Sequence, residues 1–322
     1  MTTIAPPVIR PAYRPYRAVV RRVERLSPHF ARITFASDEF EHFGTAGLDQ
    51  RIKLIFPFAD GSLCDVGQDD EERRLAGDWY DTWRALPEER RNPFRTYTVR
   101  RIDPVACLLT VDFVVHHDAG PAGTWAENVR GGEEIVIVGP DERSPHSRGG
   151  IDFRPANASR LLLIGDETAV PAIGGILDCL PEGRTADVFV EVPSVADAGV
   201  FEAPNAGVNI RWIVREREGG TEREHGEALI EAVADWAQAH RDVLSVAVAA
   251  APRPQELADV DVDREMLWDS PDPIEGEFYA WIAGEAATIK QLRRLLVSTH
   301  GVDRRRVAFM GYWRRGIAER TG

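Results

Sequence analysis

The spacing of apolar residues changes near Asn157 and divides the chain into two different patterns. Before that point, apolar residues alternate with polar ones over short stretches separated by turn-forming residues, as is typical of β-strands. These stretches are residues 17–23, 30–35, 51–56, 96–99, 108–115 and 134–138. Six short strands in succession predict a closed antiparallel β-barrel.

After Asn157, apolar runs alternate with amphipathic stretches of helical spacing. We expect strands at residues 160–164, 186–192, 209–214, 245–249, 277–283 and 307–310, and helices near residues 168–179, 224–239 and 286–299. This alternation predicts an α/β domain with a doubly wound parallel sheet. A chain of 322 residues is too long for one ordinary core. We therefore expect a β-barrel domain at residues 1–156 and an α/β domain at residues 157–322.

Two polar segments interrupt these patterns. Residues 59–92, between the third and fourth expected strands, are rich in charge and contain a helix-compatible stretch around residues 78–86. We interpret this segment as an insertion in the barrel domain. Residues 252–276 are polar and acidic, and they predict a surface loop with some helix.

Composition excludes several functional classes. The net charge of -13 disfavours nucleic acid as a partner, because phosphate binding needs a basic surface. The sequence has no run of eighteen apolar residues, so we expect no membrane insertion. The first residues lack a basic region followed by an apolar one, so we expect no secretory signal.

The cysteines point to a reducing compartment. Cys64, Cys107 and Cys179 are odd in number and have no C-x-x-C spacing, which argues against a disulfide framework and an iron–sulfur site. The sequence also shows no His/Cys cluster with metal-ligand spacing, so we expect no protein-bound metal. The cytoplasm is the expected location.

The run Arg95-Thr-Tyr-Thr-Val-Arg100 combines an aromatic ring, hydroxyls and two guanidinium groups on one expected strand. Strand alternation sends Arg95, Tyr97 and Val99 to one face, and Thr96, Thr98 and Arg100 to the other. A planar ring system can lie along Tyr97 with hydrogen-bond donors nearby, and an arginine can bind an anionic pyrophosphate. The run therefore indicates a flavin site.

Three further segments carry recognisable motifs. In residues 112–126, a strand ends in paired histidines and a Gly/Pro turn opens a helix at about Thr124; in residues 161–172, an apolar strand breaks at Gly165 into a helix; residues 311–316 read Gly-Tyr-Trp-Arg-Arg-Gly. In this order and spacing, these segments and the R-x-Y-T-x-R run resemble the siderophore-interacting proteins, a branch of the ferredoxin reductase-like flavoproteins. The resemblance covers nearly the whole chain.

The resemblance implies that the barrel domain binds FAD, with the insertion at residues 59–92 beside it. Tyr97 would stack on the flavin ring, Thr98 would bond its polar edge, and Arg95 would contact the phosphates. His116 would contact the phosphates or a ribose, and the N–H groups that open the next helix would bind the pyrophosphate. Trp125 is expected to pack on the barrel. Further flavin-binding candidates are Asp112, Val114, Ala119, Ala122, Gly123 and Thr124.

The resemblance also implies that the second domain binds a nicotinamide nucleotide at the carboxyl ends of its strands. Thr168 would orient the nicotinamide, and Asp166 would lie in the same turn, where either residue can also cap the following helix. The other candidates at this site are Gly284, Glu285, Tyr312 and Trp313. Glu191, after the second strand, offers a carboxylate to a ribose hydroxyl and favours NADH, whereas Arg215 and Arg217 leave NADPH open.

The implied activity is NAD(P)H-driven reduction of a ferric siderophore, by hydride transfer to FAD and then single-electron transfer to iron. Tyr97 and Thr168 are the catalytic candidates. Relatives are thought to attract anionic chelates with lysines, but Lys53 and Lys290 are the only lysines here. The substrate-binding candidates are therefore Arg51, Lys53, Arg314 and Arg315.

Three alternative functions remain open at this point. A general flavin reductase would use loosely held flavin as a substrate. A ferredoxin-dependent reductase would take electrons from a ferredoxin partner and ignore both nicotinamides. A non-enzymatic protein would bind the chelate without flavin, although the R-x-Y-T and G-P-A motifs argue against this.

Overall fold

The computed structural model describes residues 9–115, 120–217, 219, 221–249, 255 and 267–316. Contacts divide these residues into two units. The first unit ends at Ile151, and the second begins at Asp152 and also includes Leu26–Phe30. The domain boundary expected after residue 156 stays a prediction.

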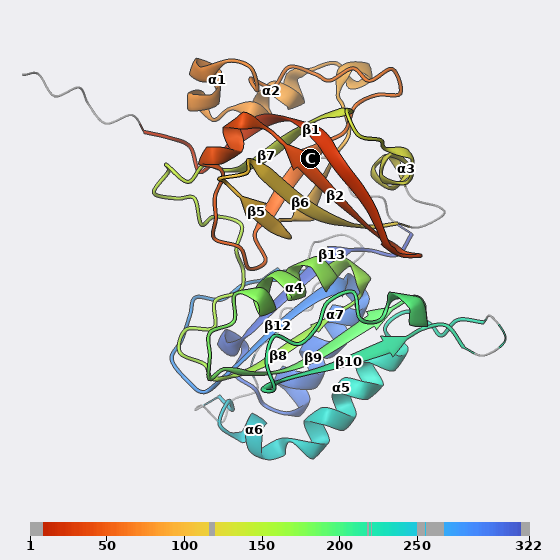
Figure 1. Ribbon diagram of the computed structural model, residues 1–322. Helices are drawn as coiled ribbons and strands as arrows, with labels where there is room; N and C mark the ends of the chain where they lie inside the picture. The colour runs from red at the N-terminus through yellow and green to blue at the C-terminus, as the bar shows by residue number, and fades with distance from the viewer. Residues whose placement is uncertain are drawn as a thin grey trace, which may run out of the picture. The chain divides into compact units, whose positions relative to one another are not determined.

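The first unit is a strongly curled antiparallel sheet of seven strands (Figure 1). Its strands are β1 (Tyr13–Ser27), β2 (Phe30–Ala36), β3 (Arg51–Ile55), β4 (Phe94–Thr98), β5 (Arg101–Asp103), β6 (Leu108–Val114) and β7 (Glu134–Pro140), in the order β4-β3-β7-β1-β2-β6-β5. The end strands β4 and β5 are joined by only two residues, so the sheet curls round on itself. The predicted antiparallel barrel domain is confirmed as a curled, half-barrel sheet, and the three-residue β5 is an addition to the prediction.

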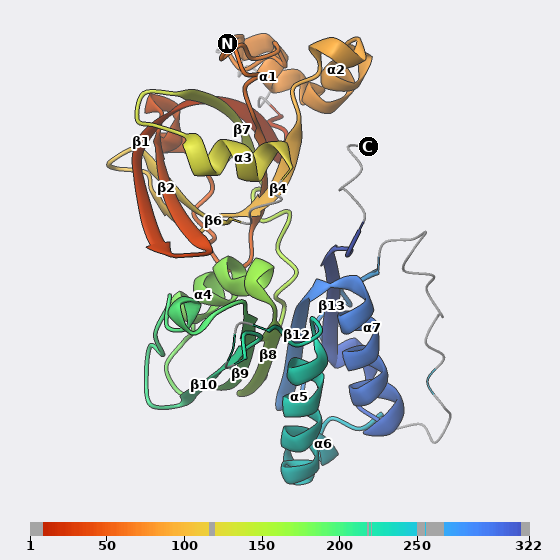
Figure 2. The ribbon, with the colours of Figure 1, turned by 90° about the vertical axis from the view of Figure 1, so that its right-hand side faces the viewer.

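Alternating side chains build the core of the first unit. Inward-facing residues such as Ile33, Phe35, Phe113 and Ile135 are completely buried. Helix α3 (Pro121–Asn128) lies across the curled sheet and adds Trp125 to this core (Figure 2). The prediction that Trp125 packs on the barrel is therefore confirmed.

The insertion at residues 59–92 is anchored by aromatic packing. It contains α1 (Glu71–Ala76), α2 (Trp79–Ala85) and a short 3-10 helix at Glu88–Arg90. Trp83 of α2 packs on Phe94 of β4 with ring centroids 4.8 Å apart. These rings form a second small core with Ile55, Val136 and Val138, on the outer face of the sheet. The helix expected around residues 78–86 is confirmed.

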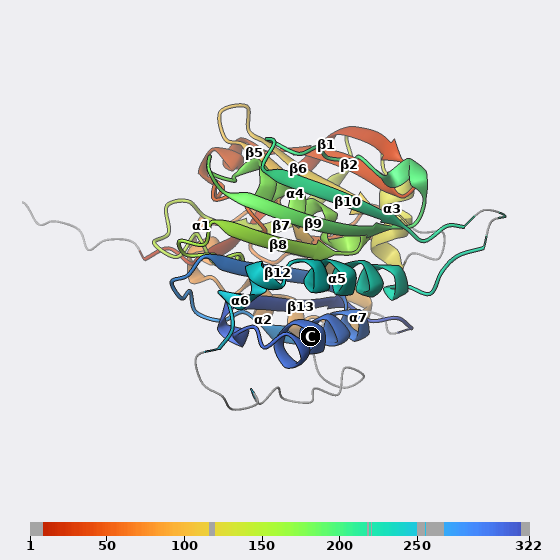
Figure 3. The same cartoon turned by 90° about the horizontal axis from the view of Figure 1, so that it is seen from below.

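The second unit is a six-stranded, mostly parallel sheet (Figure 3). Its parallel strands are β8 (Arg160–Gly165), β9 (Thr185–Val192), β10 (Val208–Val214), β12 (Phe278–Glu285) and β13 (Val307–Trp313). The order is β10-β9-β8-β12-β13-β11, where β11 (Trp268–Asp269) pairs antiparallel with β13 at the edge. The chain reverses its direction across the sheet between β8 and β12, which creates a topological switch point there.

Helices cover both faces of this sheet (Figure 2). Helix α4 (Val170–Asp178) lies on one face, and α5 (Glu227–Ala239) and α7 (Ala286–Arg293) lie on the other, with α6 (Arg241–Ser245) after α5. α7 continues as a π-helical stretch, Arg294–Thr299. Leu162 and Ile164 of β8 pack on Leu229, Val233 and other buried residues of the α5 and α7 layer. The doubly wound prediction is confirmed.

One expected strand is wrong. Residues 245–249 were expected to be extended, but α6 ends at Ser245, and Val248 contributes only an isolated bridge to Val302. Val246 and Val248 are about half exposed, at 49% and 50%, whereas Ala247 is completely buried. The apolar alternation therefore buries only one small side chain, and that is too little to hold a strand in the sheet.

No helix in the described ranges combines the length and the apolar character that crossing a bilayer requires.

Candidate functional site

In the first unit, β3 and β4 bring predicted substrate and flavin residues together. The antiparallel register pairs Arg51 with Thr98 and Lys53 with Thr96, so these four side chains share one face. The Lys53 Nζ donates a hydrogen bond to the Thr96 hydroxyl at 2.6 Å. Two cationic side chains thus lie beside Thr98 of the R-x-Y-T run.

Tyr97 lies on the opposite face of β4, as strand alternation predicts. Its ring is partly buried and contacts Phe113, with ring centroids 4.4 Å apart and a tilt of 44°. Phe56 packs against both Tyr97 and Trp125, at 6.1 and 5.2 Å. Arg95, on the same face as Tyr97, donates from Nη1 to the Phe94 carbonyl at 2.7 Å. The Tyr97 ring is therefore held in place by an aromatic cluster.

Asp112 of β6 is already engaged by arginine. Its two carboxylate oxygens accept hydrogen bonds from Arg32 at 2.7 and 2.8 Å, and Arg100 Nε lies 3.7 Å away. Asp112 is buried, so this ion pair fixes neighbouring strands of the barrel. Val114, at the end of β6, is partly buried. His116 and Ala119 lie outside the described residues.

The amino end of α3 offers backbone donors. Gly120 is the N-cap and Pro121 the first helical residue, three residues before the predicted start at Thr124. The Thr124 N–H bonds the Gly120 carbonyl at 3.1 Å, whereas helix geometry gives the N–H groups of Ala122 and Gly123 no partner within the helix. A Cβ at Gly120 would meet no atom within 4 Å. This open backbone and the helix dipole suit the anionic pyrophosphate of FAD.

In the second unit, Asp166 joins three strand ends. It follows β8 and is 1% exposed. Its Oδ1 accepts hydrogen bonds from the Thr168 N–H at 2.9 Å and from the Thr168 hydroxyl. Its Oδ2 accepts from the Glu285 N–H and from Trp313 Nε1, both at 2.8 Å. Asp166 also caps the short helix Glu167–Ala169, as predicted.

Gly284 permits the close approach of Asp166 to the end of β12. It has φ of +149°, and a Cβ at this position would lie 2.6 Å from Asp166 Oδ2. Any other residue would displace the carboxylate from the Glu285 N–H. The predicted residues Asp166, Thr168, Gly284, Glu285 and Trp313 therefore meet at one point.

Glu167 and Arg215 form a buried bidentate pair beside this point. The Arg215 nitrogens donate to the two Glu167 oxygens at 2.6 and 2.7 Å, and Nη1 also donates to Glu191 Oε1 at 3.2 Å. Burial would raise the pKa of Glu167, but interaction with His225 and Arg215 outweighs burial and lowers this pKa to about 2. Glu191 is completely buried, so the expectation that it meets a ribose hydroxyl is not supported.

His225 completes this group, and the sequence analysis missed it. Its Nε2 lies 3.5 Å from Asp166, 3.7 Å from Glu167 and 3.8 Å from Glu191, measured to carboxylate oxygens. The ring meets Trp313 edge-on, with centroids 5.1 Å apart. Burial opposes the charge on His225, but the surrounding carboxylates raise its pKa. Asp166, Glu167 and Glu191 are called the carboxylate cluster below.

Burial and the charge of Glu167 together raise the pKa of Asp166. Neighbouring carboxyl groups in the cluster thus have pKa values shifted in opposite directions. This is the expected result when several acids share a buried site with one guanidinium.

The remaining predicted residues lie around this group. Glu285 caps α7 by accepting from the Thr288 N–H at 2.9 Å. Tyr312 stacks on Trp268, with centroids 5.8 Å apart, whereas the neighbouring Trp313 bonds Asp166. Arg315 is exposed and donates to Glu224 at 2.6 Å, and Arg314 is partly buried.

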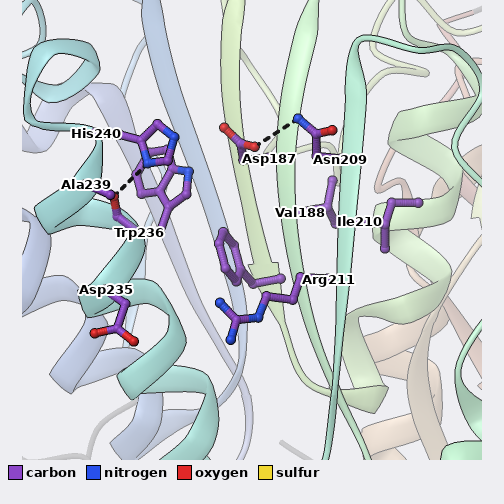
Figure 4. A pocket seen from close by; sticks show the side chains of 10 residues that line it. Asp187, Val188, Asn209, Ile210, Arg211, Asp235, Trp236, Ala239 and His240 are labelled. Carbon is purple, nitrogen blue, oxygen red and sulfur yellow. Dashed lines mark hydrogen bonds between the residues drawn. The ribbon is translucent and has the colours of Figure 1, made fainter.

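A separate pocket of about 390 Å³ lies between α5 and the strands β9 and β10 (Figure 4). It is lined by Asp187, Asn209, Arg211 and Asp235, and by Trp236, on which His240 stacks. Asp187 and Asn209 lie near the amino ends of β9 and β10, whereas Glu191 lies near the carboxyl end of β9 and Arg215 follows β10. The pocket therefore contains none of the predicted site residues.

The contact at Gly284 predicts a specific loss of stability. Gly284→Ala should lower the free energy of unfolding by about 1–3 kcal/mol more than Gly183→Ala, because the new Cβ overpacks against Asp166. Gly183 is the matched control, since it also has a positive φ of +85° but nothing within 4 Å of the added Cβ. Denaturant unfolding followed by far-UV circular dichroism measures both variants. Equal losses would show that the approach to Asp166 imposes no constraint.

Comparison with known proteins identifies the family. Residues 19–144 match the model of a siderophore-interacting FAD-binding domain, and residues 158–316 match the model of siderophore-interacting protein. The chain is 30% identical to an uncharacterized protein of Mycobacterium tuberculosis, over 96% of this chain and 93% of that one. It is 25% identical to the ferric vibriobactin reductase ViuB of Vibrio cholerae, over 92% and 89% of the two chains.

The fold agrees with these matches. The crystal structure of a siderophore utilization protein from T. fusca is similar, with a TM-score of 0.64, 25% identity and coverage of 97% of each chain. The matched domains follow each other in the order predicted from the sequence, with the FAD-binding domain first. The chain belongs to the siderophore-interacting protein family.

Proposed function

We propose that this protein is an FAD-dependent, NAD(P)H-driven ferric-siderophore reductase. The carboxyl edge of the second sheet carries this proposal, because Asp166, Thr168, Gly284 and Trp313 meet there beside the switch point between β8 and β12. Open α/β sheets bind nucleotides at such an edge. A chain that pairs this edge with a family FAD-binding domain has the two sites that the reaction needs.

The first unit would hold FAD through the groups already described. Tyr97 presents a fixed, partly exposed ring, Thr98 and Arg95 lie on the same strand, and the amino end of α3 suits the pyrophosphate. His116, Asp112, Val114 and Ala119 stay candidates for the remaining contacts. Bound FAD would accept two electrons as a hydride and pass them on one at a time.

The second unit would orient the nicotinamide nucleotide. Asp166 bonds both the Thr168 backbone N–H and its hydroxyl, so the orientation of the Thr168 side chain toward a nicotinamide ring is fixed. Trp313 is held by the same carboxylate and is partly exposed, so it can border the nicotinamide. Their common anchor makes Thr168 and Trp313 a preorganised pair.

The structure supports NADH over NADPH. A 2′-phosphate needs an arginine or lysine at the carboxyl edge, but both ends of the Arg215 guanidinium already bind Glu167. Arg217 is half exposed and lies 3.9 Å from Glu227. Binding a phosphate through Arg215 would break a buried ion pair and leave Glu167 uncompensated.

The substrate would be an anionic or nearly neutral ferric chelate. Arg51 and Lys53 share one face of β3, and Arg314 and Arg315 follow β13, so they are the candidate contacts. Iron(III) in such chelates is held by hard oxygen ligands, and reduction to iron(II) weakens these bonds and releases the metal. Cys64, Cys107 and Cys179 are free, which supports a reducing cytoplasm as the location.

An anaerobic absorbance titration tests the proposal. The purified protein, loaded with FAD, receives NADH or NADPH and then a ferric hydroxamate chelate. We expect NADH to bleach the flavin band and the chelate to restore it with formation of iron(II). A band that reduced ferredoxin bleaches but neither nicotinamide does would favour the ferredoxin-dependent alternative. Complete loss of FAD on dilution, with free flavin reduced catalytically, would favour the general flavin reductase.

The Thr168 hydroxyl provides the first sharper prediction. Thr168→Val should slow flavin reduction by NADH about 10-fold, equivalent to about 1.4 kcal/mol of barrier, while FAD stays bound. Thr168→Ser keeps the hydroxyl and should react like the wild type. Anaerobic stopped-flow absorbance measures the rates. Equal rates for the valine and serine variants would reject an orienting role for the hydroxyl.

The Tyr97 ring provides the second prediction. Tyr97→Ala should weaken FAD binding up to about 10-fold, because an aromatic stacking contact contributes about 0.5–1.5 kcal/mol. Tyr97→Phe keeps the ring and should bind FAD normally. Fluorescence titration of the apoprotein with FAD gives the dissociation constants. An alanine variant that binds as tightly as the phenylalanine variant would contradict stacking.

A further inference from the structure

The carboxylate cluster gathers three buried acids around one arginine. Asp166, Glu167 and Glu191 are 1%, 2% and 0% exposed. Among the described residues, the Arg215 guanidinium bonds Glu167 and Glu191. Glu191 Oε2 is buried and has no hydrogen-bond partner among the described residues. Buried carboxylates normally require a matching cation or hydrogen-bond donors. The cluster therefore has capacity for a further cationic ligand.

His225 points to the kind of cation. Its side chain is 9% exposed, and neither ring nitrogen has a hydrogen-bond partner among the described residues. Its Nε2 faces the three carboxylates at 3.5–3.8 Å, which is too long for hydrogen bonds. In a tetrahedral site with bonds of about 2.0–2.1 Å, neighbouring ligand atoms are roughly 3.3 Å apart. The His225 contacts lie near this spacing.

We propose that His225, Asp166 and Glu167, with Glu191 as a fourth ligand, bind a divalent first-row transition-metal ion such as Zn²⁺. One ligand atom from each of the first three residues lies within 4.8 Å of the others. One imidazole nitrogen among carboxylate oxygens suits Zn²⁺ and its neighbours, whereas Mg²⁺ and Ca²⁺ prefer oxygen alone. No atom of FAD or of the nicotinamide nucleotide is a ligand in this site, although Asp166 also anchors Thr168 and Trp313.

The surrounding groups act as an outer shell for such an ion. Arg215 orients Glu167 through two hydrogen bonds, and the Gly226 N–H orients Glu191 by donating to Oε1 at 2.9 Å. The Glu285 N–H and Trp313 Nε1 orient Asp166. Ligands held by outer-shell hydrogen bonds in this way bind a metal more tightly. The ion would tie the ends of β8 and β9 to the start of α5.

Metal retention by the full-length chain tests this proposal. The purified protein is stripped with a chelator, incubated with ZnCl₂ without FAD or NADH, desalted and analysed by elemental mass spectrometry. We expect about one Zn²⁺ per chain and a higher midpoint of thermal unfolding, as a ligand selective for the folded state requires. His225→Gln and Glu191→Gln should each weaken Zn²⁺ binding by about 10-fold or more.

His300→Gln is the matched control, because His300 is a partly buried histidine of the second unit, and the ion pairs between a histidine and the carboxylate cluster in the described residues are those of His225. Equal Zn²⁺ affinity in His225→Gln and His300→Gln would overturn the proposal, and so would failure of the wild type to retain Zn²⁺. In that case a protonated His225 supplies the missing charge. Retention of Mg²⁺ in place of Zn²⁺ would also overturn it.

A measurement on the wild-type protein tests the proposal even if the variants fail to fold. X-ray absorption at the zinc edge should show nitrogen and oxygen ligands only. Sulfur ligands would place the ion at Cys64, Cys107 or Cys179 and reject the cluster. Because no step uses flavin or nicotinamide, failure of this proposal leaves the reductase proposal untouched, and the reverse also holds.

Discussion

The carboxylate of Asp166 is the interaction on which the carboxyl edge of the second sheet depends. Its two oxygens accept hydrogen bonds from Thr168, the Glu285 backbone and Trp313, which belong to three separate segments. A buried carboxylate is tolerated only when such donors are in place, so each donor is held as firmly as the acceptor. Gly284 makes room for this arrangement. The positions of Thr168 and Trp313 therefore follow from one acid.

A buried ion-pair network connects β9 and β10 to the same carboxyl edge of the second sheet. Arg215, after β10, bonds Glu167, after β8, and Glu191 in β9. This arrangement occupies the Arg215 guanidinium, and it leaves Glu191 Oε2 without a hydrogen-bond partner among the described residues. The proposed preference for NADH and the proposed cation site both depend on this arrangement, in which Arg215 bonds the buried acids Glu167 and Glu191.

Much of the fold could be predicted because it depends on local patterns of apolar and polar residues. Alternation marked the barrel strands, and the change near Asn157 separated them from the α/β pattern. The same reasoning failed at residues 245–249, where alternation was present but only Ala247 is buried. It also missed β5 and β11, which have three and two residues and are too short to show a period. Alternation is informative only where one face of a strand has something to pack against.

The sequence by itself determined the two-domain fold, the family and the positions of the motifs, since each motif consists of residues that are close together in the chain. Only the tertiary structure brought Trp313 to Asp166 across 147 positions, and His225, Glu191 and Arg215 to the same point. No local spacing links these residues. Parallel strands from distant segments end at one edge of the sheet, and that strand order decides which side chains share a buried site.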